Sequence, residues 1–285
     1  MAGYYERRYK TQDGLTLYYR DYGDPDGSTT PLLCLPGLTR NSKDFHREAS
    51  RLSKKRRVIC PDYRGRGESE YDPTAKSYLP TIYLNDIRHL LAVTGIGRVI
   101  VIGTSLGGLL AMGMGAAMPT TLVGVVLNDI GPEIPNGGLD KIIDFISTDR
   151  PHGNWDSAVK DLRQNFPHLT FDTEQGWRDA AQATWREGNN GKLHFDWDIR
   201  LAAILSEGPP IPNLWPLFSA LGEVPTLAIR GALSDMLSTE TFEKMAMIRP
   251  NLQQLTVPGA GHVPTLSELV VQTKIDRFLA TLPKI

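Results

Sequence analysis

The chain has 285 residues, of which 41 % are hydrophobic and 22 % charged, and its formal net charge is −1 at pH 7. These values are typical of an ordinary globular protein and exclude disordered and fibrous classes. The balanced charge gives no electrostatic footprint for nucleic acid, and the sequence has no run of about 18 apolar residues that could span a bilayer.

Seven short segments rich in apolar and β-branched residues end in turn-forming residues and are predicted to be strands. They span residues 15–22, 31–35, 57–61, 98–103, 122–129, 225–231 and 252–257. Helical patterns cover residues 42–53, 81–93, 105–118, 239–248 and 266–282. This alternation predicts an α/β fold with a mostly parallel sheet and helices on both faces.

Residues 131–222 interrupt the alternation. This segment contains all five tryptophans and many prolines, and its patterns are helical. We therefore predict a core domain formed by residues 1–130 and 223–285, with a helical cap inserted at 131–222. The cap is expected to lie over the strand ends and to set substrate choice through its aromatic residues.

The remaining composition points away from redox, metal and cofactor chemistry. Cys34 and Cys60 lie at the ends of apolar runs, where free cysteine behaves as a small buried hydrophobe. Two cysteines without clustered histidines cannot form a zinc site. Residues 113–118 approach a dinucleotide fingerprint, but the third glycine is missing and the segment lies inside a predicted helix. We expect no cofactor, no metal and, since the first residues lack the apolar core of a signal peptide, a cytoplasmic location.

The stretch GTSLGG, residues 103–108, follows a β-branched strand and opens a helix. Ser105 lies at the break, and a sharp strand-to-helix turn would place its hydroxyl at the ligand-binding edge of the sheet. Gly103 and Gly107 provide the lack of bulk that such a turn requires. Ser105 is therefore the predicted nucleophile.

A serine nucleophile needs a base that is itself oriented by a third group. Among the six histidines, only His262 falls in a loop that follows a predicted strand. Two acids also follow strands: Asp235 in GALSD, and Asp129 at the tip of the strand before the inserted segment. The chain order Ser105, Asp235, His262 favours Asp235 as the orienting acid, with Asp129 as the alternative.

The oxyanion of an acyl-transfer reaction needs two backbone donors. One is expected to be the N–H of Leu106, directly after the nucleophile. The other is expected from the loop after the 31–35 strand, where Pro36 and Gly37 bend the chain and Leu38 offers its N–H.

Five landmarks in order make the chain resemble the α/β-hydrolase-fold serine hydrolases over nearly its whole length: LPGLT, DYRGRGES, GTSLGG, GALSD and GAGH. The resemblance implies a sheet of about eight strands and a Ser-His-Asp triad. The DYRGRGES loop, residues 62–69, resembles a stretch that is structural in relatives. Relatives usually carry His-Gly where this chain has Pro36-Gly37, so any orienting role of that histidine must be met by other residues.

The expected activity is hydrolysis of a small ester or related acyl substrate through an acyl-enzyme. Relatives that open epoxides or remove halide use aspartate at the elbow, so Ser105 argues against both. Carbon–carbon hydrolases of ring-cleavage products keep the same triad and form the main alternative, ahead of lactonases, perhydrolases and hydroxynitrile lyases. A different class, the ligand-sensing receptors of the same fold, is disfavoured by an intact triad. The acyl group, leaving group and oligomeric state are not indicated by the sequence.

Overall fold

The computed structural model describes residues 3–135, 137–206 and 211–283. Eight strands form one sheet in the order β1-β2-β4-β3-β5-β6-β9-β10, and β7 pairs with β8 in a separate hairpin. The two pairings at the start of the large sheet, β1 with β2 and β2 with β4, are antiparallel, and the others are parallel. The predicted α/β class with a mostly parallel sheet is confirmed.

The strands of the large sheet are β1 Tyr4–Lys10, β2 Thr16–Tyr22, β3 Leu32–Leu35, β4 Val58–Pro61, β5 Val99–Thr104, β6 Leu122–Asn128, β9 Thr226–Gly231 and β10 Gln253–Val257. The helices that accompany them are η1 Ser42–Phe45, α1 His46–Leu52, α2 Pro80–Val93, α3 Leu106–Ala117, η2 Pro119–Thr121, α9 Thr239–Ile248 and α10 Leu269–Thr281.

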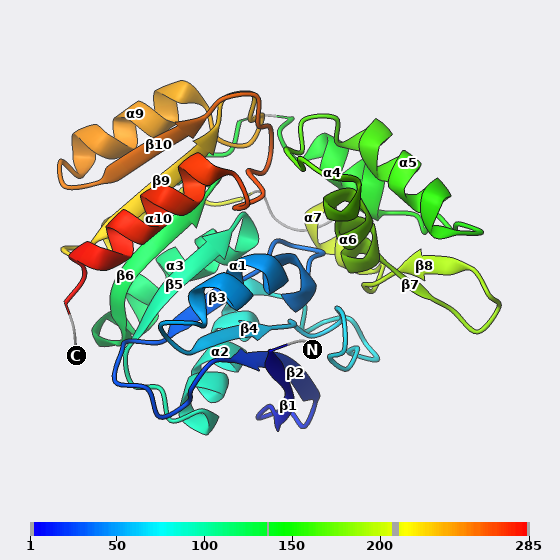
Figure 1. Ribbon diagram of the computed structural model, residues 1–285, viewed down its shortest axis with the longest axis horizontal. Coiled ribbons are helices and arrows are strands. Elements are labelled where there is room, and N and C mark those ends of the chain that lie inside the picture. Colours follow the sequence, from blue (N-terminus) through cyan, green and yellow to red (C-terminus); the bar gives the residue numbers. More distant parts are fainter. Residues whose placement is uncertain (1–2, 136, 207–210, 284–285) are drawn as a thin grey trace.

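The buried strands separate two apolar clusters because alternate residues face opposite sides. In β3, Leu32 and Cys34 pack in one cluster with residues of α1 and α10, whereas Leu33 and Leu35 pack in the other with residues of α2 and α3. Figure 1 shows α1 and α10 crossing one face of the sheet, with α2 and α3 behind it. Cys34 and Cys60 are both buried and free, as expected.

The inserted segment 131–222 lies between β6 and β9. Its elements are α4 Asp140–Ile146, α5 Trp155–Asn165, α6 Glu174–Thr184, β7 Trp185–Glu187, β8 Leu193–Phe195, α7 Leu201–Ser206 and α8 Trp215–Ser219. Of these, α4 to α7 with the β7–β8 hairpin gather at one end of the sheet (Figure 1). The last helix, α8, packs against α3 instead. Five of these seven elements are helices. The β7–β8 hairpin was not anticipated.

The first strand was also missed. β1, with the sequence YYERRYK, lies at the edge of the sheet, and most of its side chains are exposed. An edge strand with two solvent-exposed faces lacks the apolar alternation that identifies a half-buried strand.

Within the ranges that the structure describes, no helix is both long and apolar enough to cross a membrane.

Candidate active site

Ser105 forms a strained turn between β5 and α3. Its φ of 51° and ψ of −115° lie outside the regions that L residues favour, and such strain often marks a functional site. A Cβ on Gly107 would overlap the carbonyl oxygen of Leu35, and a Cβ on Gly103 would overlap the backbone of Gly107. The two glycines are therefore required because strand and helix pass each other without room for a side chain.

His262 follows β10 and reaches Ser105 across the sheet edge. Its Nε2 lies 3.0 Å from Ser105 Oγ, and its Nδ1 lies 2.7 Å from Asp129 Oδ2. A carboxylate only accepts hydrogen bonds, so Nδ1 carries the proton in this pair and Nε2 is left as an acceptor. In that tautomer the Ser105 hydroxyl donates to Nε2, which is the arrangement required of a serine nucleophile and its base.

Asp129 directly follows β6 and is completely buried. Besides His262, its carboxylate accepts hydrogen bonds from the Gly231 N–H at 2.7 Å and from the Ser234 hydroxyl at 2.6 Å. Asp129 adopts a φ of 56°, which is unusual for a residue other than glycine. Three donors and a strained backbone hold this carboxylate at one position beside the imidazole.

The prediction that Asp235 contacts His262 is wrong. Asp235 is exposed, and its Oδ2 lies 3.3 Å from Nζ of Lys141 in the inserted segment. The loop after β9 turns Ser234 inward, where its hydroxyl also accepts hydrogen bonds from the N–H groups of Met236 and Leu237. Its neighbour Asp235 consequently faces outward, and the alternative acid, Asp129, takes the position beside the histidine.

Ser234 is a site residue that sequence reasoning missed. It lies one position before the acid that the motif GALSD suggested, and nothing in the local pattern distinguishes which of the two faces inward. The short loop indicates only that these adjacent side chains point in different directions, so either could have been the inward one.

The two expected oxyanion donors lie close to Ser105 along the chain or in space: Leu106 directly follows it, and Leu38 lines the same cavity. Leu106 is the first residue of α3, where backbone N–H groups lack intrahelical acceptors. Leu38 lines the cavity that also contains Ser105 and His262. A Cβ built on Gly37 would lie 3.9 Å from Ser105 Cβ, so this loop passes directly beside the nucleophile.

The cavity has a volume of about 640 Å³ and lies between the carboxyl ends of the strands and the inserted segment. Its wall beside the inserted segment is largely apolar and includes Phe145, Leu162, Phe166 and Trp197. A space of this size and character suits a small ligand with an apolar part.

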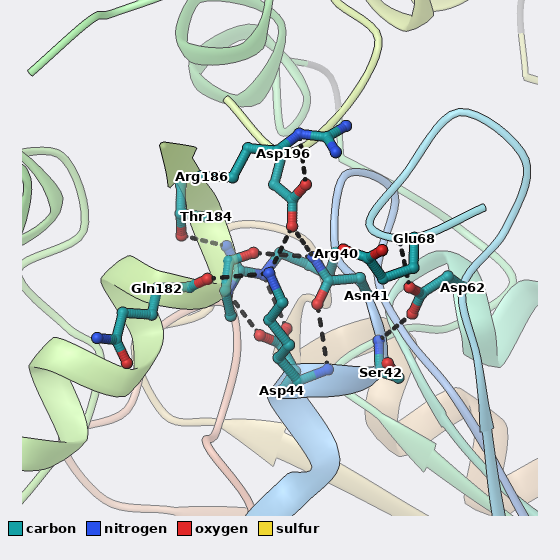
Figure 2. A network of polar contacts seen from close by, with 12 residues as sticks. Arg40, Asn41, Ser42, Asp44, Asp62, Glu68, Gln182, Thr184, Arg186 and Asp196 are labelled. Carbon is teal, nitrogen blue, oxygen red and sulfur yellow. Dashed lines mark hydrogen bonds and ion pairs between the residues drawn. The ribbon is translucent and has the colours of Figure 1, made fainter. Parts of the chain in front are cut away.

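A polar network fastens the inserted segment to the core beside this cavity (Figure 2). Asp196, which is fully buried, accepts hydrogen bonds from Lys43 Nζ at 2.7 Å and from Asn41 Nδ2 at 3.2 Å. Its other carboxylate oxygen lies 3.1 Å from Nε of Arg186. Arg40, in turn, donates to the Thr184 hydroxyl at 2.5 Å.

Asp62 lies in the same network, on the core side (Figure 2). Its carboxylate accepts the N–H of Ser42 at 2.7 Å and the N–H of Glu68 at 2.9 Å. Burial nevertheless raises the pKa of Asp62 to about 6, because loss of solvent disfavours the charged form more than these bonds favour it.

No group of three or more metal-ligating side chains occurs among the residues that the structure describes.

Comparisons with known proteins agree with this fold. The alpha/beta hydrolase family matches the chain over residues 32–272. The chain is 31 % identical over 258 residues to a 3-hydroxybutyrate-oligomer hydrolase of Cupriavidus necator, covering 87 % of both chains. A crystal structure of an alpha/beta hydrolase from Novosphingobium aromaticivorans superimposes with a TM-score of 0.91 at 41 % identity, covering 98 % of this chain and 99 % of that one. The structure of an E-2-(acetamidomethylene)succinate hydrolase gives a TM-score of 0.84 at 25 % identity, covering 98 % and 100 %.

Proposed function

The chain belongs to the alpha/beta hydrolase family, and we propose that within this family it is a serine hydrolase of small esters that uses Ser105, His262 and Asp129. The observation that carries the proposal is the continuous hydrogen-bonded chain from Ser105 Oγ through His262 to Asp129, with distances of 3.0 and 2.7 Å. Asp129 takes the role that the motif order assigned to Asp235.

In the first half of the reaction, Ser105 Oγ attacks the ester carbonyl carbon while its proton moves to Nε2 of His262. The buried Asp129 carboxylate stabilises the imidazolium that forms. The negative charge that develops on the carbonyl oxygen is stabilised by the N–H groups of Leu38 and Leu106. As the tetrahedral intermediate collapses, the bond to the leaving alkoxide breaks and His262 returns the proton to it, so an alcohol departs and an acyl-enzyme remains.

The second half repeats these steps with water. His262 removes a proton from a water molecule, whose oxygen attacks the acyl carbon, and the same two N–H groups stabilise the second oxyanion. Collapse restores the Ser105 hydroxyl and releases a carboxylic acid. The atoms balance with water as the only co-substrate.

Two observations support an ester as the substrate. The Cupriavidus relative, which covers most of the chain, is named for hydrolysis of 3-hydroxybutyrate oligomers, whose units are joined by ester bonds. The apolar wall of the cavity can accept a short aliphatic acyl chain, as such esters require. We propose short linear esters as the substrate class, with 3-hydroxybutyrate oligomers as the first to be tested.

We further propose that residues 131–222 act as a cap domain over the core formed by 1–130 and 223–285. Contributions from this segment to the cavity wall, among them Phe145 and Trp197, support that role. Such a cap would exclude water and select the acyl chain.

The experiment is a substrate panel with the purified protein and Ser105→Ala. We expect multiple turnovers of 4-nitrophenyl butyrate and of 3-hydroxybutyrate dimers, and a loss of at least about 10⁴-fold in kcat in the variant. A burst of one equivalent without turnover would instead support a receptor. Turnover confined to dienone acids of ring-cleavage type would support a carbon–carbon hydrolase. Full activity in Ser105→Ala would overturn the assignment.

A further inference from the structure

The loop between β3 and η1, residues 36–41, contains Leu38 and is called the Leu38 loop below. We propose that Arg66 is a positioning residue that holds the Leu38 loop in the shape required for oxyanion binding and that couples this loop to the inserted segment. The inference rests on the proposed function, because it concerns how one of the two proposed oxyanion donors is held. Arg66 lies in the DYRGRGES stretch and does not line the cavity that contains Ser105.

Arg66 is completely buried and has a specific environment. Its Nε donates a hydrogen bond to the Leu38 carbonyl at 2.7 Å, and its Nη1 donates to the Arg64 carbonyl at 2.7 Å and to the Tyr83 hydroxyl at 2.9 Å. The guanidinium lies within 6 Å of the ring centres of Tyr63, Tyr78 and Tyr83. These aromatic rings fix its plane, so the direction of the bond to Leu38 is fixed as well.

Three consecutive carbonyls of the Leu38 loop are restrained in this way. The Pro36 carbonyl accepts from the Tyr63 hydroxyl at 3.1 Å, the Gly37 carbonyl from the Arg40 N–H at 3.1 Å, and the Leu38 carbonyl from Arg66. A planar peptide unit whose carbonyl is held cannot rotate freely, so the N–H on the same peptide keeps its direction too. The Gly37 carbonyl shares its peptide with the Leu38 N–H, and the flanking restraints prevent that peptide from rotating.

The Leu38 loop is held by side chains from another part of the chain. Pro36 has no side-chain donor with which to orient the loop, so residues outside the loop must hold it. Here two side chains of the DYRGRGES stretch, Tyr63 and Arg66, bind the loop carbonyls at positions 36 and 38. We assign the loop-orienting role to this pair, with Arg66 making the shorter and charge-assisted bond.

The backbone around Arg66 is paired with the inserted segment. Arg66 and Trp197 form an antiparallel bridge, in which Gly67 donates its N–H to the Asp196 carbonyl at 3.0 Å and Asp198 donates its N–H to the Gly65 carbonyl at 2.8 Å. The Trp197 side chain lines the cavity. The Arg66 side chain therefore binds the Leu38 loop, while the residues on either side of it bind the inserted segment through their backbones. The positions of the Leu38 loop and of the inserted segment are coupled through this stretch.

A donor that is displaced from the developing oxyanion weakens the transition state more than the bound ester, because the charge exists only in the former. Misplacement by about 1 Å can cost on the order of 100-fold in rate. Loss of the Arg66–Leu38 bond should therefore lower kcat by about 10- to 100-fold and leave KM within about threefold.

The matched test compares Arg66→Lys with Arg64→Lys. Arg64 lies two residues earlier and is equally buried, but its guanidinium binds Asp86 and Asp13 rather than the Leu38 loop. Both variants keep the charge and lose a buried arginine, so both should lower the melting temperature. We expect only Arg66→Lys to lower kcat for 4-nitrophenyl butyrate. Arg66→Met, which fills the aromatic site without a donor, serves as a second variant.

A second readout separates positioning from general destabilisation. A trifluoromethyl ketone forms a tetrahedral oxyanion on a serine, whereas the alcohol of the same shape does not. Arg66→Lys should weaken binding of the ketone by the same factor by which it lowers kcat/KM. It should leave the affinity for the alcohol unchanged. Equal losses of kcat in the two lysine variants, or unchanged ketone affinity at Arg66→Lys, would overturn the inference. Wild-type turnover that depends on Ser105 would show that the proposed function stands in either case, and its absence would refute that function instead.

Discussion

Asp129 Oδ2 lies 2.7 Å from His262 Nδ1, although 133 positions separate the two residues along the chain. The sheet order explains the contact, because β6, which precedes Asp129, is the direct neighbour of β5, which precedes Ser105. The loop after β9 lies one strand farther away, and it supplies donors to the carboxylate instead of the carboxylate itself.

Asp129→Asn should lower kcat/KM for a chromogenic ester by on the order of 10⁴-fold. An amide at this position can donate to Nδ1 and so favours the tautomer in which Nε2 carries the proton, which prevents proton abstraction from Ser105. Asp235→Asn, the control, removes only an exposed contact to Lys141 and should change kcat/KM by less than about threefold. A greater loss at Asp235 than at Asp129 would return the orienting role to Asp235.

Ser234→Ala should lower kcat by roughly 10- to 100-fold. The Ser234 hydroxyl donates to the buried Asp129 carboxylate at 2.6 Å, and a hydrogen bond to a charged group contributes about 1.5–3 kcal/mol. Steady-state kinetics with Ser234→Ala and Ser234→Thr test the role, since threonine can restore the hydroxyl. A kcat equal to wild type in the alanine variant would limit Ser234 to capping the turn at Met236 and Leu237.

The sequence predicted most of the sheet and the pairing of Ser105 with His262 because the signals for both are local. Ser105 and its two glycines lie within five residues, and the steric reason for them is the close crossing of strand and helix. The carboxylate beside His262 was mispredicted because Asp129 and Asp235 both follow strands, and only the packed sheet decides which strand end faces His262. The role of Arg66 was hidden for the same reason, since its partner Leu38 lies 28 positions away.

Gly107→Ala should prevent stable folding or lower the free energy of unfolding by at least about 3 kcal/mol. The added Cβ would overlap the Leu35 carbonyl, and backbone atoms of two packed elements cannot move apart as a flexible side chain can. Gly97→Ala is the matched control, because a Cβ there meets nothing within 4 Å. Denaturant unfolding of both proteins measures the difference, and equal stability of the two variants would contradict the steric account of the turn.

Asp62 should make the folded state less stable as the pH rises. Its pKa is about 6 in the folded protein against an ordinary value of 3.8, so the folded state binds more protons between these values. The contribution of Asp62 to the free energy of unfolding is therefore fully present below about pH 4 and is lost as the pH rises from 3.8 to 6. The total loss is about 3 kcal/mol. Denaturant unfolding of wild type and Asp62→Asn from pH 4 to 7 tests this. The free energy of unfolding of wild type minus that of Asp62→Asn should fall as the pH rises. A difference that stays constant over this range would contradict the prediction.

Trp197→Leu should change which acyl chain the protein prefers, whereas Trp185→Phe should change only stability. Of Trp197 and Trp185, only Trp197 lines the cavity. Trp185 is fully buried and donates its Nε1–H to the Arg150 carbonyl at 3.1 Å, within the inserted segment. Each methylene gained or lost in an apolar pocket can alter kcat/KM by about 10-fold or more. The ratio of kcat/KM for octanoate over butyrate 4-nitrophenyl esters should therefore rise at least about 10-fold in Trp197→Leu, where a smaller side chain leaves more room. An unchanged ratio in Trp197→Leu, or an altered one in Trp185→Phe, would place acyl-chain selection elsewhere in the molecule.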